Sequence, residues 1–508
     1  MIRQRLWLVF RFAFRRTKLE SDVAFSGETV YDTLVRNVEI LDGGGGESRQ
    51  GDVAIAGGKI AHVGELGGCT ARETVDGGGK VLAPGFIDAH THDDLYLLRS
   101  PEMLPKLSQG VTTVVVGNCG ISAAPVRLQG ELPDPMNLLG VAGEFRYAKF
   151  ADYVAAVAEA QPAVNVAALV GHTALRNNFM DRLDRTATSE EIVEMRGQLS
   201  EALDHGALGL STGLAYASAH SASTEEVMAL AEPLHEAGAI YATHLRSESD
   251  TLFEAVDEAV GIGEHGKVPV VISHLKCAGV DHWGKSGELL TSLGKVRERA
   301  TVGWDCYPYA AGSSTLDLKQ VDERVTIAIT WSEPHPEMAG QTLSEIAATW
   351  KMPQIEAARR LQPAGAIYHS ISEDDMRAIL RHPETMIGSD GLPSDPRPHP
   401  RLWGTFPRVL GVYGREEKLF SMSEAVRKMT SLPAQRFGLT DRGWVREGYA
   451  ADLVLFDAET VRDAATFADS ARAAVGIEGV WVNGVLSYAR QVSTGQRAGW
   501  FLPRAARG

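Results

Sequence analysis

Short apolar runs alternate with helical patterns through the middle of the chain. Eight runs follow one another: GFIDAHTH, VTTVVVGNC, VNVAALVGH, GALGLSTG, AIYATH, VPVVISH, ATVGWD and ETMIGSD. Runs rich in β-branched residues and separated by amphipathic segments are typical of βαβ units with a parallel sheet. The pattern therefore predicts an α/β protein with a (β/α)8 TIM-like barrel over residues 84–440.

The segments between these runs carry helix start and stop signals. Thr188 with Glu191, and Ser223 with Glu226, match the capping box that opens many helices. Glycines near residues 206 and 238 stand where those two helices should stop.

The flanks of the barrel have a different pattern. Short β-like runs with glycine-rich turns fill residues 31–83 and recur in residues 441–490, so we expect the two segments to form one small β domain. The interval between the seventh and eighth runs is much longer than the others, and residues 317–372 predict an inserted helical lid over the barrel mouth. Residues 1–30 are expected to form a disordered extension, and residues 491–508 a tail.

Composition narrows the class of protein. The net charge of -15 argues against a nucleic-acid partner, because such proteins carry a clustered basic surface. Arginines are dense only in the first eighteen residues, where a targeting or membrane-surface segment is the alternative to a disordered extension. No other stretch predicts a membrane span. Four cysteines are too few for a disulfide framework and favour a reducing, cytoplasmic location.

Unusual polar residues stand where the predicted strands end. They are His90, His92, Cys119, His172, His244, His274 and Asp390. Each alone has an ordinary explanation, as a buried thiol, a hydrogen-bonded core histidine or a helix cap. The carboxyl ends of barrel strands converge on one mouth, however, and active sites lie there. Together these residues predict a metal site.

The residue types indicate which metal. Cys119, His244 and His274 offer sulfur and imidazole ligands that suit zinc and leave one position for water. The pKa of such a water falls to about 7 in favourable sites. The H-x-H pair with Asp390 could hold a second ion, or could orient the water without one. Asp390 also fits the general base, which can return the proton to a leaving nitrogen.

Several motifs in order resemble the amidohydrolase superfamily and, within it, the N-acyl-D-amino-acid deacylases, also called D-aminoacylases. They are PGFIDAHTHDD, GNCGISAAP, GHTALR, GALGLSTGLAY, YATHLRSE, ISHLK, DCYPYAAGSS, GSDGLPSDPRPHPRLWGTFPRVLG and GYAADLVLFD. The resemblance implies a tight zinc at Cys119, His244 and His274, a weaker position at His90 and His92, and Asp390 as the catalytic acid/base. It implies hydrolysis of N-acyl-D-amino acids to a carboxylic acid and a free D-amino acid.

The same resemblance implies how a small-molecule substrate is held. Lys276, Arg401, Tyr307 and Ser313 match residues that bind the free α-carboxylate, and Tyr216 matches the residue that polarises the scissile carbonyl. On a strand, Lys276 should share a face with the histidine two residues before it. The prolines around Arg401 stiffen the loop that presents its guanidinium. An ordinary explanation for both cations is a solvated charge at the rim.

Two departures from the family concern specificity. After Tyr216 the chain reads ASAHSASTEE in place of a Pro-Gly turn, and His369 and Ser370 replace apolar residues in the lid. A cyclic-amide hydrolase of the dihydropyrimidinase or dihydroorotase kind is one alternative, although its usual carboxylated lysine is missing from the fourth run, GLSTG. A non-catalytic barrel scaffold is the other. The preference for D over L substrates follows only from the resemblance, and oligomerisation stays open.

Overall fold

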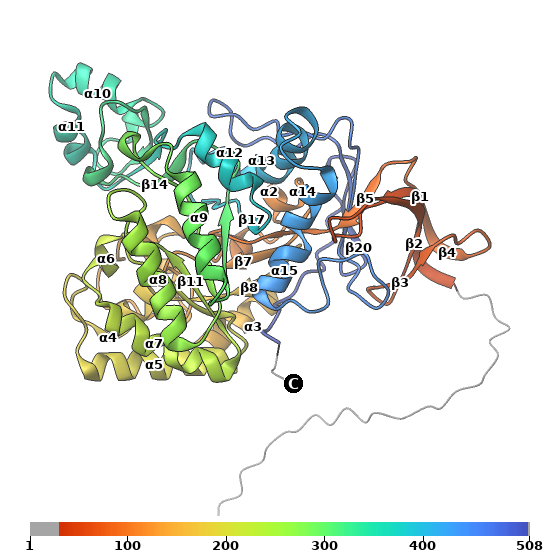
Figure 1. Ribbon diagram of the computed structural model, residues 1–508, viewed down its shortest axis with the longest axis horizontal. Helices are drawn as coiled ribbons and strands as arrows, with labels where there is room; N and C mark the ends of the chain where they lie inside the picture. Colours follow the sequence, from red (N-terminus) through yellow and green to blue (C-terminus); the bar gives the residue numbers. More distant parts are fainter. Residues whose placement is uncertain (1–29, 506–508) are drawn as a thin grey trace, which may run out of the picture.

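The centre of the computed structural model, which describes residues 30–505, is a closed barrel of parallel strands (Figure 1). The strands are β6 (Phe86–Asp88), β7 (Val111–Val116), β8 continuing into β9 (Asn165–Ala168 and Val170–Gly171), β10 (Gly209–Gly213), β11 (Ile240–His244), β12 (Val270–Ile272), β13 (Val302–Cys306) and β17 (Thr385–Ile387). The amide of Ala89 donates to the carbonyl of Ile387 at 3.2 Å, which joins the last strand to the first. The barrel predicted from the eight runs is confirmed.

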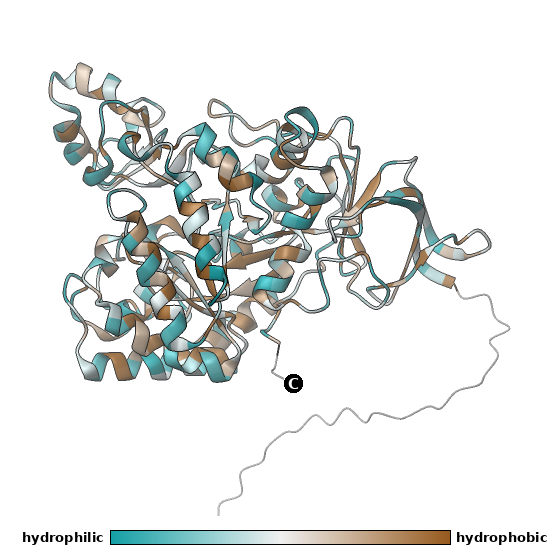
Figure 2. Ribbon diagram, viewed as in Figure 1, coloured by the Kyte–Doolittle hydropathy of each residue, from teal (hydrophilic) through white to brown (hydrophobic). Residues whose placement is uncertain are grey.

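Helices cover the outside of the barrel, so its strands are buried on both faces. They are α1 (Tyr96–Arg99), α2 (Leu104–Leu107), α3 (Phe150–Ala160), α4 (His172–Phe179), α5 (Ser189–Asp204), α6 (Ala217–His220), α7 (Thr224–Ala237), α8 (Leu252–Gly266), α9 (Ser286–Arg297), α12 (Glu373–Arg381), α13 (Arg401–Arg408), α14 (Met422–Met429) and α15 (Ser431–Phe437). Figure 2 shows hydrophobic strands at the centre and helices with hydrophilic outer faces. This pattern explains the near-continuous apolar runs, because a parallel sheet has no solvated face.

The helix signals are mostly as predicted. Thr188 and Glu191 form a complete capping box at the start of α5. At α7, Ser223 accepts a hydrogen bond from the Glu226 amide, but the Glu226 carboxylate turns away from the cap. It binds a buried imidazole and a buried guanidinium instead, which is why the second capping box forms only by half.

Strands from both ends of the chain share a second sheet beside the barrel, at the right of Figure 1. They are β1 (Val30–Ile40), β2 (Arg49–Ala56), β3 (Lys59–Gly64), β4 (Thr70–Asp76), β5 (Val81–Pro84), β18 (Leu453–Phe456), β19 (Ile477–Val482), β20 (Val485–Ala489) and β21 (Val492–Ser493). β5 and β18 pair in antiparallel orientation and join the two halves. Beyond β21 the chain returns to the barrel, where the Leu502 amide donates to the Val166 carbonyl at 2.7 Å. Leu502 packs with the inner apolar side chains of the barrel.

The long interval between β13 and β17 contains strands as well as helices. β14 (Gly312–Thr315), β16 (Ala364–Tyr368) and β15 (Ile327–Ser332) form an antiparallel sheet, joined by α10 (Leu343–Trp350) and α11 (Gln354–Leu361). These elements have their own apolar cluster and stand at the upper left of Figure 1. The sequence predicted the helices of this insertion but not its sheet. The strands β14 and β15 are short and carry serine and threonine, so they give no long apolar run.

The predicted extension, apart from Val30, lies outside the described residues. No helix within residues 30–505 is long and apolar enough to cross a membrane. All four cysteines of the chain are free thiols in this structure.

Candidate active site and metal centre

The polar residues at the strand ends gather at one mouth of the barrel. His90 and His92 follow β6, Cys119 follows β7, His244 ends β11, His274 follows β12, and Asp390 follows β17. Two groups could each hold a metal ion, one of His90, His92, Cys119 and Asp390 and one of Cys119, His244 and His274. In each group the ligand atoms lie within 4.8 Å of one another. Cys119 belongs to both groups, so the two positions adjoin.

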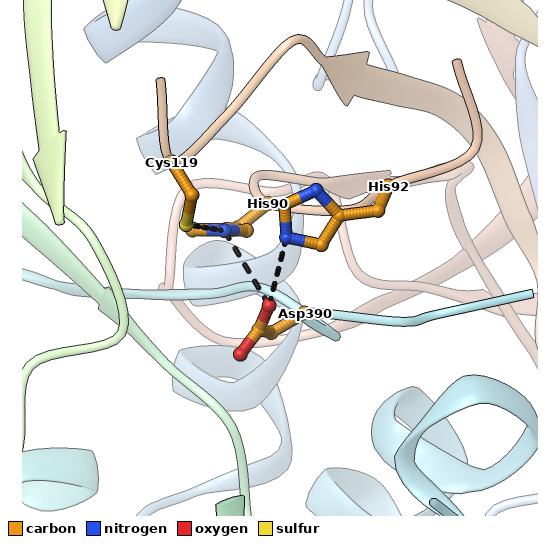
Figure 3. Close-up of side chains that lie close together, drawn as sticks. All are labelled: His90, His92, Cys119 and Asp390. Carbon is orange, nitrogen blue, oxygen red and sulfur yellow. Dashed lines mark hydrogen bonds and ion pairs between the residues drawn. The ribbon is translucent and has the colours of Figure 1, made fainter. Parts of the chain in front are cut away.

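Figure 3 shows how the first group converges. Cys119 Sγ lies 3.2 Å from His90 Nε2 and 3.4 Å from His274 Nε2. Asp390 Oδ1 lies 3.1 Å from His92 Nε2 and 3.6 Å from His90 Nε2. The predicted ligands therefore meet, although up to about three hundred positions separate them in the chain.

The second group fits a zinc ion by its chemistry. His244 Nδ1 is buried and has no hydrogen-bond partner among the described residues. A buried polar atom without a partner is costly, and a metal ion would satisfy it. One sulfur and two imidazole nitrogens are ligands that zinc prefers, with a fourth position left open in catalytic sites.

The electrostatics favour a thiolate at the shared ligand. Burial acts to raise the pKa of Cys119, but the imidazoles of His90 and His274 hold it well below its usual value. The thiolate is the form of cysteine that binds metal. Burial likewise acts against the charged form of His274, and the neighbouring carboxylate and thiolate nevertheless raise its pKa to about 9.

Glu248, which the sequence analysis did not identify, supports both histidines of the second group. Its Oε1 lies 2.9 Å from His274 Nδ1, and its Oε2 lies 3.7 Å from His244 Nε2. Lys276 Nζ donates to Glu248 Oε1 at 2.5 Å. A carboxylate beside one ring nitrogen favours the tautomer in which the other nitrogen is free to bind a metal, which is Nε2 in His274 and Nδ1 in His244. Its position four residues after His244, in THLRSE, was the available signal.

Asp305 supports the other side of the site. Its Oδ2 lies 3.3 Å from His90 Nδ1, and its Oδ1 accepts the backbone amide of His274 at 3.0 Å. Asp305 is buried and ends the run ATVGWD, so its place at the end of the seventh strand was the signal that could have identified it.

Asp390 is held between the histidines and a guanidinium. Its Oδ2 lies 2.9 Å from Arg401 Nη1. Burial acts to raise the pKa of Asp390, but Arg401 and then His92 lower it well below its usual value. The carboxylate is therefore ionised, which is the form that accepts a proton.

A cavity of about 220 Å³ adjoins these groups. Predicted site residues that line it are His92, Tyr216, His244, His274, Lys276, Tyr307, Ser313 and Asp390. Residues of the insertion, among them Thr315, Lys319 and Tyr368, form another part of its wall. Arg401 is not among the lining residues: its guanidinium lies 4.6 Å from the centre of the Tyr307 ring and donates to the Ser313 carbonyl at 3.1 Å.

Three residues with hydroxyl groups, Tyr216, Tyr307 and Ser313, line this cavity. The Tyr307 hydroxyl and the Ser313 hydroxyl are buried and have no hydrogen-bond partner among the described residues. The Tyr216 ring lies 4.8 Å from the His244 ring. Burial, and then the negative charges of Cys119 and Asp390, raise the pKa of Tyr216 well above its usual value. Its hydroxyl thus stays protonated and can donate a hydrogen bond.

His172 does not join the metal-binding groups. Its Nε2 lies 2.9 Å from Glu226 Oε1, and Arg176 binds the same carboxylate at 2.5 Å. Burial lowers the pKa of this histidine. A buried carboxylate on α7 holds this imidazole, so the polar residue at the third strand end lies outside both metal-binding groups.

The sequence matches a known protein family over most of its length. The model of the amidohydrolase family matches residues 73–488. A D-aminoacylase of Alcaligenes xylosoxydans xylosoxydans is 48% identical over 94% of this chain and 98% of its own. An N-acyl-D-aspartate deacylase of the same organism is 48% identical over 92% of this chain and 93% of its own.

Solved structures give the same relation. The N-acyl-D-glutamate deacylase of Bordetella bronchiseptica, complexed with zinc and a phosphonate that mimics the tetrahedral intermediate, superimposes with a TM-score of 0.90. It is 44% identical, and the match covers 93% of this chain and 100% of that one. The L-hydantoinase of Arthrobacter aurescens is 15% identical with a TM-score of 0.58, over 94% of this chain and 100% of that one, and shares the fold alone. The chain belongs to the amidohydrolase family and, within it, to the N-acyl-D-amino-acid deacylases.

Proposed function

We propose that this protein is a zinc-dependent hydrolase that cleaves the amide bond of N-acyl-D-amino acids. The observation that carries the proposal is the convergence of Cys119, His244 and His274 beside Asp390 and Tyr216 at a single cavity. Identity of 44–48% to deacylases over most of the chain supports the substrate class. The products are a carboxylic acid and a free D-amino acid.

The cysteine and two histidines, Cys119, His244 and His274, are proposed as the tight zinc ligands. When bound, zinc supplies a Lewis acid that polarises a carbonyl oxygen and lowers the pKa of a bound water towards about 7. His90 and His92 are proposed as a weaker second position next to Asp390, supported by their shared group with Cys119.

Asp390 and Tyr216 are the proposed catalytic residues. The ionised Asp390 takes a proton from the attacking water and later gives it to the leaving nitrogen, which one positioned carboxylate can do in sequence. The protonated Tyr216 hydroxyl donates a hydrogen bond to the acyl oxygen as negative charge develops on it.

The substrate α-carboxylate is proposed to bind at the side of the cavity lined by Lys276, Tyr307 and Ser313. The unpartnered hydroxyls of Tyr307 and Ser313 support this, because a carboxylate would accept a hydrogen bond from each. Arg401 is proposed as a further cation for the same carboxylate. Its pairing with Asp390 implies that the incoming anion competes with Asp390 for the guanidinium.

We also propose how the accessory segments serve the site. Residues 31–83 and 441–490 act as one small β domain, supported by the shared sheet, and residues 317–372 act as a lid, supported by their share of the cavity wall. A cytoplasmic location is proposed from the four free thiols.

A substrate screen tests the function. N-acetyl and N-formyl derivatives of D- and L-amino acids with acidic, apolar and aromatic side chains are assayed beside hydantoins and dihydroorotate. We expect turnover of the linear D-compounds alone, and turnover confined to the cyclic amides would contradict the proposal. Zinc analysis of the purified protein distinguishes a scaffold, which would lack stoichiometric metal. Cys119→Ala should lose both tight zinc and turnover.

A further inference from the structure

Lys106, on α2, is a fully buried lysine behind the metal-binding residues. Its Nζ lies 2.7 Å from Asp88 Oδ2 and 3.1 Å from Asp93 Oδ2. It also donates to Thr91 Oγ1 and Ser389 Oγ, each at 2.9 Å. An ammonium has three donor hydrogens, so four acceptors at these distances leave no donor free. The buried cation is fully engaged by its neighbours and has no role in reaching substrate.

The partners of this ammonium come from two of the three segments that carry the first metal-binding group. Asp88, Thr91 and Asp93 alternate with the two histidines of the H-x-H pair. Ser389 directly precedes Asp390. One cation therefore binds the loop that presents the histidines and the loop that presents the proposed acid/base.

These two loops meet where the barrel closes. Ser389 donates to Asp88 twice, from its hydroxyl at 2.6 Å and from its amide at 2.8 Å. The Asp390 amide donates to the His90 carbonyl at 2.7 Å, and the His92 amide donates to the Gly391 carbonyl at 3.1 Å. β6 and β17 are only three residues long, so few strand hydrogen bonds are available to fix their ends. Polar side chains take over that task.

We propose that Lys106 is a positioning residue that sets the separation between the H-x-H histidines and Asp390. It acts through Asp88 and Ser389, because it does not line the cavity. The separation it sets is the 3.1 Å between His92 Nε2 and Asp390 Oδ1. Its effect on catalysis rests on the proposed hydrolysis, whereas its effect on zinc binding rests only on the proposed second metal position.

Lys106 neutralises two buried carboxylates, so replacing it changes the stability of the fold as well as the positions of the two loops. Lys106→Met leaves Asp88 and Asp93 without a counter-ion, which destabilises a buried cluster strongly. Ser389→Ala removes the hydroxyl link between the two loops and the hydrogen bond that the same oxygen accepts from the Gly391 amide at 3.1 Å, and it keeps both lysine–aspartate contacts. Ser108→Ala is the matched control, because Ser108 is also fully buried and its hydroxyl has no partner among the described residues.

Two measurements test the proposal. Zinc is titrated into the metal-free protein, and kcat and KM are measured with the N-acetyl-D-amino acid that the wild type prefers. For Ser389→Ala we expect the second zinc equivalent to bind about tenfold more weakly, as for other outer-shell changes, with the first unchanged. We expect kcat to fall at least fivefold with KM within twofold. Lys106→Met, where it folds, should exceed these losses, and Lys106→Arg should recover part of them.

The proposal is overturned if Ser389→Ala keeps the second zinc equivalent and kcat of the wild type, or if Ser108→Ala shows equal losses. A fall in thermal stability alone, with both readouts unchanged, would also overturn it. If the wild type hydrolyses no N-acyl-D-amino acid, the proposed function fails and the zinc titration alone decides the role of Lys106. If the wild type binds only one equivalent of zinc, the kcat of Ser389→Ala decides the role of Lys106.

Discussion

Replacing Glu248 by glutamine should weaken zinc binding at Cys119, His244 and His274. In the wild type, Glu248 Oε1 lies 2.9 Å from His274 Nδ1 and Oε2 lies 3.7 Å from His244 Nε2. Glutamine keeps the length of the side chain but removes its negative charge and one acceptor oxygen. The imidazoles then become weaker ligands, and the tautomers that leave His274 Nε2 and His244 Nδ1 free are less strongly favoured.

The size of the effect follows from these contacts. Loss of an outer-shell partner typically costs about 10–100-fold in metal affinity, which is about 1.4–2.7 kcal/mol. Glu248 serves both histidines, so we expect the upper part of this range. Burial opposes the charge on Lys276, and Glu248 is what raises its pKa despite that burial. The variant should therefore also lower the pKa of Lys276 and the stability of the metal-free protein.

Zinc affinity is measured by competition between the metal-free protein and a chromophoric chelator. Glu258→Gln is the matched control, because Glu258 is a partly buried glutamate that accepts two 2.8 Å hydrogen bonds from Arg246 on the outer side of the barrel. It should bind zinc as the wild type does. A zinc Kd for Glu248→Gln within twofold of the wild type would refute the reasoning, since the carboxylate would then contribute nothing to the ligands.

Three further results are expected. Asp390→Asn should keep the tight zinc and lose about 10²–10⁴-fold in kcat; near wild-type turnover would contradict its role as acid/base. Tyr216→Phe should lower kcat about 10²–10³-fold, as loss of an oxyanion donor does, and an unchanged kcat would exclude that role. In the metal-free protein the pKa of His274 is raised to about 9, so its proton stabilises the fold below about 6.5 and this contribution is lost as the pH rises through 9. Zinc must displace that proton, so the apparent affinity of the protein for zinc should increase about tenfold per pH unit up to about pH 9. A zinc Kd that is constant from pH 6 to 8 would contradict the raised pKa of His274.

The barrel was predictable because its strands are buried on both faces and read as apolar runs. The strands of the insertion were not predictable in the same way. Ser313 and Thr315 are buried in β14, yet a serine-rich segment of four residues resembles a loop in sequence. At α7, the local capping signal of Glu226 lost to a buried ion pair with Arg176 that only the tertiary fold creates.

In the site, too, local sequence patterns were readable, whereas contacts made only by the tertiary fold were not. The clustering of the proposed metal ligands was predictable because each stands at the end of a recognisable strand, and topology then brings them together. Glu248, Asp305 and Lys106 contact those ligands or their loops from behind, and their partners lie 4 to 283 positions away in sequence. Arg401 is a different case: the family resemblance implied a substrate contact, and the fold adds an ion pair with Asp390 that the sequence did not indicate.

Three residues at the proposed metal site have a strained backbone conformation. Cys119, His274 and Asp390 have φ values of 53°, 36° and 48°, in the left-handed region that favours glycine. Each such residue costs on the order of 1–3 kcal/mol and persists only where its surroundings hold it. Glycine would relieve the strain but would remove the thiolate, imidazole or carboxylate that the site needs. Because structural zinc sites release about 10–16 kcal/mol in small peptides, metal binding can offset the whole cost. The left-handed turns at the strand ends are therefore a cost of directing ligands from separate strands towards one point.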